Sequence, residues 1–516
     1  MQSLVDFLNG IIWSPALIYL CLGAGLFYSV ITRFVQIRHF FEMWRLLFSG
    51  KSSQKGISSF QALAVSLSGR VGTGNIAGVA AAIGFGGPGA VFWMWMVAFF
   101  GAATAYAEST LAQIYKEDDD GQFRGGPAYY IEKAMGQKWY AWIFAIATIF
   151  ACGVLLPGVQ SNSIGNAVEA AFGSGQMIET AVGTFSFAKI FTGTVISIIL
   201  AFIIFGGVKR IAHFTQIVVP FMALAYIVTA FVIILLNISA VPVIFAMIIE
   251  DAFSPMAGFG AAIGWGVKRG VYSNEAGQGT GPHAAAAANV DHPAQQGLVQ
   301  SFSIYIDTLL VCSATAFMIL ITGAYNVHGA GEAFLIQNVA AEISANGPVF
   351  TQMAIESALP GVGKPFIAVA LFFFAFTTIL AYYYIAETNI AYIRRTFKVS
   401  GLMFILKLVL ISAVFYGTVK TANLAWAMGD VGVGLMAWLN IVGILIIFFL
   451  SKPAIKALKD YEEQQKAGVT EYTFNPVKLG IKGADYWEDR YRREHGDPKA
   501  PVDKEVDVEV LNNTSS

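Results

Sequence analysis

The feature that most constrains the fold of this chain is a long apolar run, about residues 59–85, that is interrupted in its middle. A run of about 20 apolar residues is long enough to cross a bilayer as a helix. The centre of this run, residues 66–75, reads Ser-Leu-Ser-Gly-Arg-Val-Gly-Thr-Gly-Asn. Glycine costs about 1 kcal/mol relative to alanine inside a helix. The three glycines of this stretch therefore predict a break in the helix.

A break at this depth has chemical consequences. Irregular backbone inside a membrane is tolerated only where it is buried in protein or lines a wet cavity. Amides freed at the start of a half-helix attract anions, and carbonyls freed at the end of one attract cations. The stretch therefore predicts a site for a zwitterion together with a cation. The alternative is that the glycines only allow close helix packing, which does not explain Arg70 and Asn75.

Bulk composition indicates a polytopic membrane protein. Of the 516 residues, 56% are hydrophobic and 13% charged, with a mean hydropathy of +0.62. Coarse hydropathy predicts about eleven spanning segments. The net charge of −1 does not indicate a nucleic-acid-binding protein, which would carry an excess of positive charge. The three cysteines lack disulfide or zinc spacing, and no His-Glu-x-x-His motif, nucleophile elbow or histidine cluster indicates an enzyme.

The apolar pattern predicts four regions. They are a leading helix with a basic loop (residues 1–56), a first five-helix repeat (57–236), a second five-helix repeat with outer loops (237–450) and a tail that is mostly disordered after a short basic helix (451–516). Lysine and arginine concentrate on one side of this arrangement. We therefore expect a multi-pass protein of the plasma (inner) membrane. By the positive-inside rule, its amino terminus lies outside and its carboxyl terminus in the cytoplasm.

A second interrupted run lies five spans after the first. Residues 269–282 at its centre read Arg-Gly-Val-Tyr-Ser-Asn-Glu-Ala-Gly-Gln-Gly-Thr-Gly-Pro. Each break falls in the first helix of a five-helix set, and repeats with an odd number of helices have opposite topology. Paired glycine-interrupted segments at matching places in two halves indicate the binding site of a transporter.

Four motifs occur in order along the chain: Gly-Arg-Val-Gly-Thr-Gly-Asn-Ile-Ala-Gly (69–78), residues 93–108 ending in Ala-Tyr-Ala-Glu, residues 269–277, and Phe-Phe-Ala-Phe-Thr-Thr (373–378). Through them the membrane portion resembles the alanine or glycine:cation symporter family. The resemblance implies an all-α polytopic protein with one leading helix and a five-plus-five inverted-repeat core, as in sodium-coupled leucine and neurotransmitter transporters. It also implies Na⁺-driven uptake of a small neutral amino acid.

The predicted Na⁺ ligands come from two segments. If the first half-helix ends near Ser68, the carbonyls of Ser68 and Val71 are free to bind a cation. The resemblance adds the hydroxyls of Thr377 and Thr378 and the carbonyl of Phe374. The alternative for the two hydroxyls is back-bonding to the preceding helical turn.

The predicted substrate site comprises Thr73, Gly74, Asn75, Gln160, Tyr272, Ala276, Gly277 and Tyr382. The amides of the first three would bind a carboxylate. Carbonyls of the second break would accept the ammonium group, and Tyr272 would cover it. Gln160 would hydrogen-bond the substrate; for Gln160 and for Asn162 the alternative is a role in joining helices. Tyr382 stands where the family often has tryptophan, which leaves glutamine or serine open as substrates beside alanine.

The charged residues near these segments allow weaker expectations. Glu275 is a cation ligand or the partner of Arg70, and we favour the pair because an unpaired carboxylate at mid-depth is costly. The carboxylates of Glu108 and Asp307 are expected to find hydrogen-bond partners near helix ends, away from the transport path. Lys268 and Arg269 are expected in the outer vestibule.

Three hypotheses about function remain. The first is Na⁺-coupled symport of alanine or glycine, with no protein partner. The second is the same transport coupled to protons. The third is a channel or facilitator, whose pore would need no ligands for a coupling ion.

Overall fold

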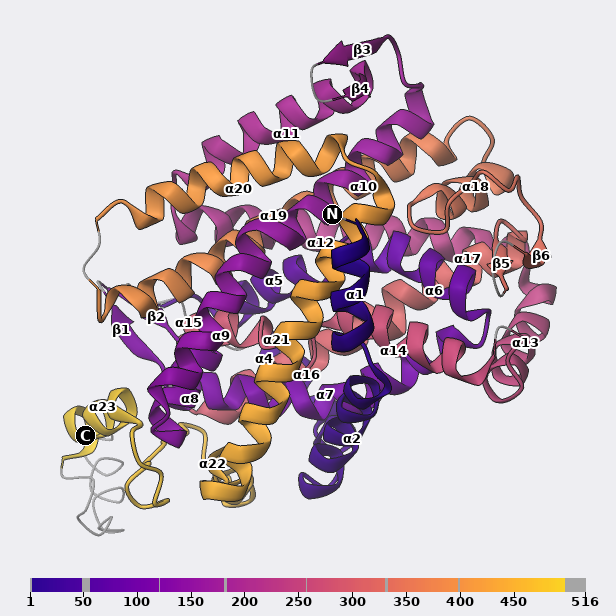
Figure 1. The fold of residues 1–516 in the computed structure, drawn as a ribbon. Helices are drawn as coiled ribbons and strands as arrows, with labels where there is room; N and C mark the ends of the chain where they lie inside the picture. The colour runs from indigo at the N-terminus through magenta and orange to yellow at the C-terminus, as the bar shows by residue number, and fades with distance from the viewer. Residues whose placement is uncertain are drawn as a thin grey trace, which may run out of the picture.

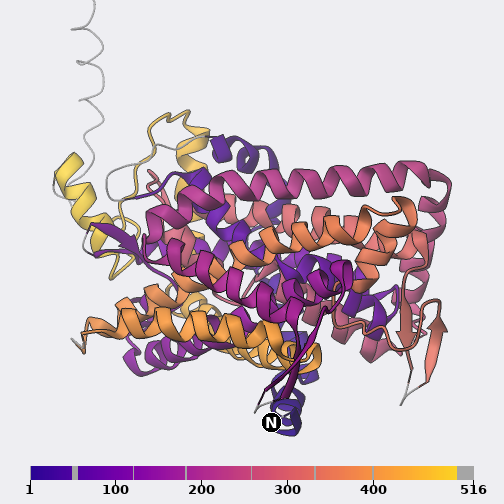
Figure 2. The same ribbon diagram turned by 90° about the horizontal axis from the view of Figure 1, so that it is seen from above.

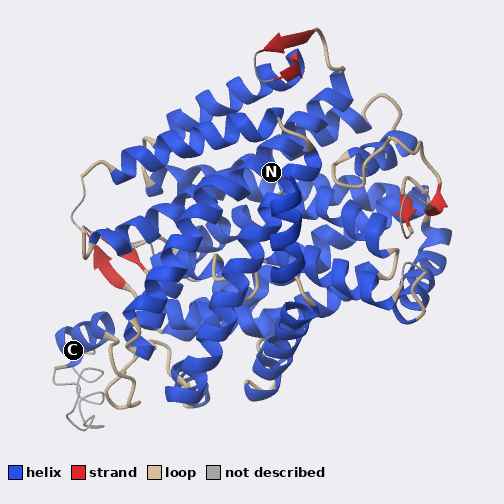
Figure 3. Ribbon diagram, in the orientation of Figure 1, coloured by secondary structure: helices blue, strands red, loops and turns tan. Residues whose placement is uncertain are grey.

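The computed structural model describes residues 2–48, 56–119, 121–180, 183–256, 258–329, 333–397 and 400–496. Residues 49–55 of the predicted basic loop and residues 497–516 of the predicted tail lie outside these ranges. Most of the described chain is helical, and three short antiparallel strand pairs lie at its margins (Figure 3). The pairs are β1 (Glu117–Asp119) with β2 (Gln122–Arg124), β3 (Met177–Thr180) with β4 (Gly183–Ser186), and β5 (Asn326–His328) with β6 (Phe334–Gln337).

Eight helical segments of the described residues are long and apolar enough to cross a membrane. They are α7 (Ala90–Ile114), α9 (Lys138–Phe150) running through the π-helix η2 (Ala151–Leu155) into α10 (Leu156–Phe172), α11 (Phe187–Ile204), α12 (Val208–Leu236), α16 (Pro293–Ile304) running through η4 (Tyr305–Cys312) into α17 (Ser313–Thr322), α19 (Gly363–Arg394), α20 (Leu402–Val419) and α21 (Ala422–Ser451). The chain is therefore an all-α, multi-pass membrane protein.

Three further segments belong with these helices. α1 (Gln2–Ile12) and α2 (Pro15–Ile31) are bent by 45° and pass the same test as a pair. The interrupted segments are α5 (Ser59–Arg70) with η1 (Gly74–Gly78) and α6 (Val79–Gly86), and α14 (Phe259–Asn274) with α15 (Gly281–Ala287). Counted as crossings, these segments are compatible with the predicted eleven.

The short elements gather at two opposite ends of the molecule (Figures 1 and 2). One end holds β1, β2 and four helices: α3 (Val35–Arg38), α8 (Pro127–Met135), α22 (Pro453–Lys466) and α23 (Asp485–His495). We call this end the basic face, because Arg33, Arg38, Lys133 and Arg395 lie there. The other end holds the remaining strands, α13 (Val241–Phe253) and α18 (Val349–Ala358). Two further short helices are α4 (Phe40–Phe48) and the 3₁₀-helix η3 (Ile238–Ala240).

Small residues determine how closely the second interrupted segment approaches the core. Gly266 and Gly270 lie one turn apart on α14 and face α7. A Cβ atom on Gly266 would lie 2.6 Å from the Cβ of Trp93, and one on Gly270 would meet the side chain of Val97. Without side chains at these positions, the two backbones pack directly against each other.

The segment after α21 is more ordered than the sequence predicts. Tyr461 on α22 and Trp487 on α23 are fully buried, and the Trp487 indole donates to the carbonyl of Gln113 at the end of α7 (2.7 Å). α22 agrees with the short helix expected at the start of the tail, whereas the expectation of disorder after it is wrong for residues 467–496. The mean hydropathy of this segment is low, but a few of its aromatic side chains pack against the helical core, and this packing is not visible in the sequence.

Charge pairing also fastens this segment to the basic face. Glu462 of α22 accepts hydrogen bonds from Arg33 (2.8 Å), Arg38 (2.7 Å) and His39 (3.1 Å). Burial alone would raise the pKa of Glu462, but the hydrogen bonds from Arg38 and His39 outweigh it and hold that pKa below its ordinary value. The carboxylate thus remains charged and joins α22 to the loop after α2.

We predict that Trp487→Ala loosens α23 from the basic face. Truncating a buried tryptophan typically costs about 3–5 kcal/mol, and here the hydrogen bond to Gln113 is lost as well. Limited trypsin digestion in detergent should cut the variant faster than the wild type in residues 467–496. Trp139→Ala, at a tryptophan that is 65% exposed, is the control and should digest like the wild type. Equal digestion of all three proteins would show that Trp487 does not anchor α23.

Candidate functional site

The first predicted interruption lies where the sequence places it. α5 begins with a capping box, in which Ser58 and Gln61 exchange hydrogen bonds, and it ends at Arg70. Val71 and Gly72 are not helical, and the π-helix η1 starts at Gly74. All residues from Ser66 to Asn75 are buried. The freed backbone groups therefore need partners from within the protein.

A side chain from α10 supplies one of these partners. The amide oxygen of Gln160 accepts a hydrogen bond from the Thr73 backbone N–H at 3.0 Å. The Gly72 N–H donates to the Asn75 side chain (2.8 Å), and the Asn75 N–H donates to the Gly72 carbonyl (3.3 Å). Gln160 and the first break, both predicted to line the substrate site, are thus in contact. The Gln160 oxygen thus occupies the Thr73 amide, which was predicted to bind the carboxylate of the substrate.

Thr378 of α19 joins the other side of the break. Its hydroxyl oxygen lies 2.7 Å from the Ser68 carbonyl oxygen and 3.0 Å from that of Phe374. One hydroxyl proton can serve only one of these carbonyls at a time. Three hard oxygen atoms from α5 and α19 therefore converge in a fully buried space, which is the ligand chemistry that a hard cation prefers.

The remaining predicted cation ligands are placed differently. The Thr377 hydroxyl bonds back to the carbonyls of Phe373 (2.9 Å) and Phe374 (3.0 Å) and faces Met222 of α12. It makes no hydrogen bond to α5. The Val71 amide donates to Leu67 (2.7 Å), and its carbonyl has no hydrogen-bond partner among the described residues. The structure therefore brings Ser68, Phe374 and Thr378 together, and it gives Thr377 the back-bonded arrangement.

Asp307 is the residue whose importance the sequence did not reveal. It lies in the π-helical turn η4 and is fully buried. Its carboxylate accepts hydrogen bonds from Asn75 of the first break (2.6 Å), from Ser273 of α14 (2.9 Å) and from Thr308 (2.6 Å). The expectation that Asp307 lies near a helix end is therefore wrong. Asp307 instead connects the two interrupted segments. The signal, a carboxylate within an apolar run, was present, but sequence alone does not show its partners.

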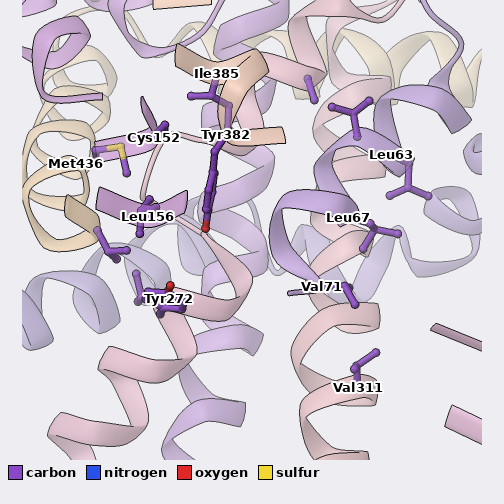
Figure 4. Close-up of a cluster of buried hydrophobic side chains, with 14 of the residues drawn as sticks. Leu63, Leu67, Val71, Cys152, Leu156, Tyr272, Val311, Tyr382, Ile385 and Met436 are labelled. Atoms are coloured by element: carbon purple, nitrogen blue, oxygen red, sulfur yellow. The ribbon is translucent and has the colours of Figure 1, made fainter. Parts of the chain in front are cut away.

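The second interruption also agrees with the prediction. α14 ends at Asn274, Glu275 adopts a left-handed conformation with a φ of 57°, and α15 starts at Gly281. The two breaks face each other, because a Cβ atom on Gly74 would lie 3.1 Å from the Ser273 Cα. Figure 4 shows Tyr272 and Tyr382 pointing into the same space, with Leu156 beside them. The Tyr272 ring also packs on Trp426 of α21, with 5.0 Å between ring centroids.

Ala276 and Gly277 face a different neighbour from the one expected. The Gly277 amide donates to Glu108 of α7 (3.2 Å), and its carbonyl accepts from Asn440 of α21 (2.9 Å). Ala276 packs against Gly101 of α7. These two residues turn toward α7 and not toward the first break. Glu108 is satisfied, as predicted, but its partner is the second break and not a helix end.

Comparison with known proteins identifies the family. The model of the sodium:alanine symporter family matches residues 1–475. The chain belongs to this family. It is 57% identical to a putative sodium/proton-dependent alanine carrier of Bacillus subtilis, over 96% of this chain and 99% of that protein. It is 51% identical to a sodium/proton-dependent alanine carrier of Bacillus sp. PS3, over 87% and 98%. A probable sodium/glutamine symporter of Bacillus subtilis is 38% identical, over 94% and 96%.

One solved structure is also similar. The crystal structure of MhsT in complex with L-phenylalanine aligns with a TM-score of 0.44 and 15% sequence identity, over 77% of this chain and 99% of that chain.

Several polar residues of this family member serve to join helices. Asn162 of α10 donates to the carbonyls of Gly417 (2.9 Å) and Lys420 (2.7 Å), the alternative role that its sequence context allowed. Arg70 was expected to pair with Glu275, but no ion pair joins them. Arg70 instead donates to Gln300 (3.2 Å) and to Ser303 of α16. A Cβ atom on Gly281 would meet the Arg70 guanidinium, so the glycine leaves room for Arg70 to extend past the second break to α16.

Lys268 and Arg269 are not free vestibule residues. Both pair with Asp430 of α21, Arg269 through two hydrogen bonds of 2.8 and 3.0 Å and Lys268 at 2.7 Å. The Arg269 guanidinium also lies over the Trp426 ring, 4.4 Å from its centroid. The cluster also lies against Tyr272, because the Arg269 guanidinium is 5.8 Å from the centroid of the Tyr272 ring. Asp430 gives the same sequence signal as Asp307, a carboxylate in an apolar run.

We predict that Gly72→Ala destabilises the first break. A Cβ atom there would meet the Thr378 hydroxyl and lie 3.0 Å from the Gln160 amide oxygen. Overpacking of this kind typically costs about 1–3 kcal/mol. Thermal unfolding of the purified protein in detergent measures the loss. Gly23→Ala, where a Cβ atom would meet nothing within 4 Å, is the matched control. If both variants melted together, the close approach of Gly72 and Thr378 would be refuted.

Proposed function

We propose that this protein is a secondary active symporter that moves a small neutral amino acid, alanine or glycine, together with Na⁺. The observation that carries the proposal is the convergence of the Thr378 hydroxyl with the carbonyls of Ser68 and Phe374, at 2.7 and 3.0 Å. Sodium replaces the hydrogen bond as the contact that joins these oxygens, while the Thr378 hydroxyl keeps its proton and binds the ion through its oxygen atom. Because α5 and α19 each contribute, the ion fixes the two helices to each other.

The amino acid binds between the two breaks. Its carboxylate takes the place of the Gln160 oxygen on the Thr73 amide and reaches the amide of Gly74. The Tyr272 hydroxyl and the Thr73 hydroxyl are buried and without hydrogen-bond partners, so they are available to a ligand. The rings of Tyr272 and Trp426 close this space, which favours a short side chain. Tyr382 lines its far side and leaves glutamine or serine as the alternative substrates.

Asn75 takes a different role from the one first expected of it. Its side chain is occupied by Asp307 and by the Gly72 amide. We therefore propose that Asn75 positions the break and that Ala276 and Gly277 hold the second break against α7. None of these three needs to touch the substrate for the site to work.

Burial of the site supports alternating access over a channel. Ser68, Thr73, Asn75 and Thr378 are each 0% exposed, so the site is closed to both ends of the molecule. Transport then requires one group of helices to rock against the other. The positive-inside rule favours a cytoplasmic basic face, and we propose that the cluster of Asp430 with Arg269 forms a gate on the outer side.

Uptake of labelled L-alanine into proteoliposomes tests the proposal. An inward Na⁺ gradient should drive saturable accumulation, and collapse of the gradient should abolish it. Accumulation that needs only a proton gradient, with Na⁺ absent on both sides, would favour the proton-coupled alternative. Flux that neither saturates nor accumulates would favour a channel.

We predict that Thr378→Ala weakens Na⁺ activation of uptake about tenfold or more. A hydrogen bond or ligand to a charged group contributes about 1.5–3 kcal/mol, and about 1.4 kcal/mol is a factor of ten. The readout is the Na⁺ concentration that gives half-maximal uptake. Thr322→Ala is the control, because the Thr322 hydroxyl only bonds back to the Met318 (2.8 Å) and Ile319 (3.3 Å) carbonyls of its own helix, α17. An unchanged Na⁺ dependence in Thr378→Ala would remove Thr378 from the cation site.

A further inference from the structure

Glu275 is a buried carboxylate in an unusual backbone conformation. It ends α14 with a φ of 57°, in the left-handed region that favours glycine, and it is 1% exposed. The left-handed region costs a residue with a side chain about 1–2 kcal/mol. Three other described non-glycine residues have a positive φ, and all three are exposed: Arg33, Phe34 and Lys452. At Glu275 the strain accompanies complete burial, which points to a function for this side chain.

Only half of this carboxyl group is satisfied. Its Oε2 atom accepts a hydrogen bond from the Thr280 hydroxyl (2.8 Å), whereas its Oε1 atom receives none. The carboxyl group borders a cavity of about 10 Å³, which is enough for one water molecule. The Ser66 hydroxyl of α5 borders the same cavity, is 4% exposed and also has no hydrogen-bond partner. A proton on Oε1 would turn this unpaired acceptor into a donor to the water or to Ser66.

Charged and titratable groups surround Glu275 from its own helix and from five other elements. They are Tyr272 of α14, Arg70 of α5, Glu108 of α7, Cys152 of η2, Asp307 of η4 and Tyr382 of α19. Glu108 and Asp307 have both carboxylate oxygens hydrogen-bonded. Arg70 makes no ion pair with Glu275, and its Nε and Nη2 atoms have no hydrogen-bond partner. Glu275 is therefore the carboxyl group at the two breaks that has an oxygen left to take up a proton.

We propose that Glu275 is the proton-binding group of this symporter, an inference that rests on the proposed function. In the closed structure the carboxyl group is neutral, with its proton on Oε1. Opening toward the basic face admits water, the O–H bond breaks, and the proton leaves to that water as the carboxylate becomes hydrated. Facing the other side, the carboxylate accepts a new proton before the next cycle, so the proton moves in the same direction as the amino acid.

The helices that line the cavity explain why proton access follows the transport cycle. Ser66 and Gly69 belong to α5, whereas Ala381 and Tyr384 belong to α19. Rocking one group of helices against the other separates α5 from its neighbours. The cavity thus opens only when the protein opens, and a proton cannot pass without the conformational change.

The test follows proton movement during transport. Proteoliposomes hold a pH-sensitive dye, and uptake of labelled L-alanine is driven by an inward Na⁺ gradient. The wild type should acidify the lumen in proportion to alanine uptake. Glu275→Gln should keep Na⁺-driven uptake but lose the acidification and the dependence of the rate on external pH. Glu275→Asp, which retains a carboxyl group, should restore part of the acidification.

Glu108→Gln is the matched control, because Glu108 is another buried carboxylate of the same region with both oxygens hydrogen-bonded. This variant should slow transport without changing the number of protons per alanine. Acidification by Glu275→Gln at the wild-type ratio would overturn the inference. So would Na⁺-driven uptake by the wild type without acidification, although the proposed symport would then stand. If Glu275→Gln does not fold, the wild type is compared with Glu275→Asp. The dye then reports the protons released per alanine by each protein when Na⁺ and alanine are added. The same number of protons per alanine from both proteins at every pH would contradict the inference.

Discussion

The structure depends on pairing the backbone groups that the two helix breaks expose. Inside a membrane no solvent satisfies a free amide or carbonyl, so every such group must find a partner in the protein. At the first break the partners are Gln160 of α10 and Thr378 of α19. At the second break they are Glu108 of α7 and Asn440 of α21. The breaks therefore fix where four other helices must lie.

This arrangement makes the site sensitive to what it binds. Each partner comes from a different helix, so a ligand that replaces one hydrogen bond alters the contact between two helices. Three π-helical segments lie around the site: η1 contains Asn75, η2 leads into the helix of Gln160, and η4 contains Asp307. Such wide turns are common at functional sites, because they re-aim one side chain without ending the helix. A small change at the site can thus be converted into movement of whole helices.

The sequence predicted the breaks and most of the spanning helices, because glycine clusters and apolar runs act locally. It also predicted that Gln160, Thr378 and the first break belong together, through resemblance. It did not predict the role of Asp307, which accepts hydrogen bonds from Asn75 and Ser273 of two other segments as well as from its neighbour Thr308. The pairing of Arg269 with Asp430 and the burial of Trp487 were missed for the same reason. Contacts between residues far apart in the chain depend on the packing of helices, which one sequence does not encode in any local pattern.

A structure determined by cryo-electron microscopy in Na⁺ and L-alanine would test the proposed site most directly. We expect the ion between the Ser68 carbonyl and the Thr378 hydroxyl, with their hydrogen bond broken, and the alanine carboxylate on the Thr73 amide in place of Gln160. Alanine bound elsewhere, or bound between the breaks while Thr378 still donates to Ser68 and no ion lies nearby, would contradict this expectation.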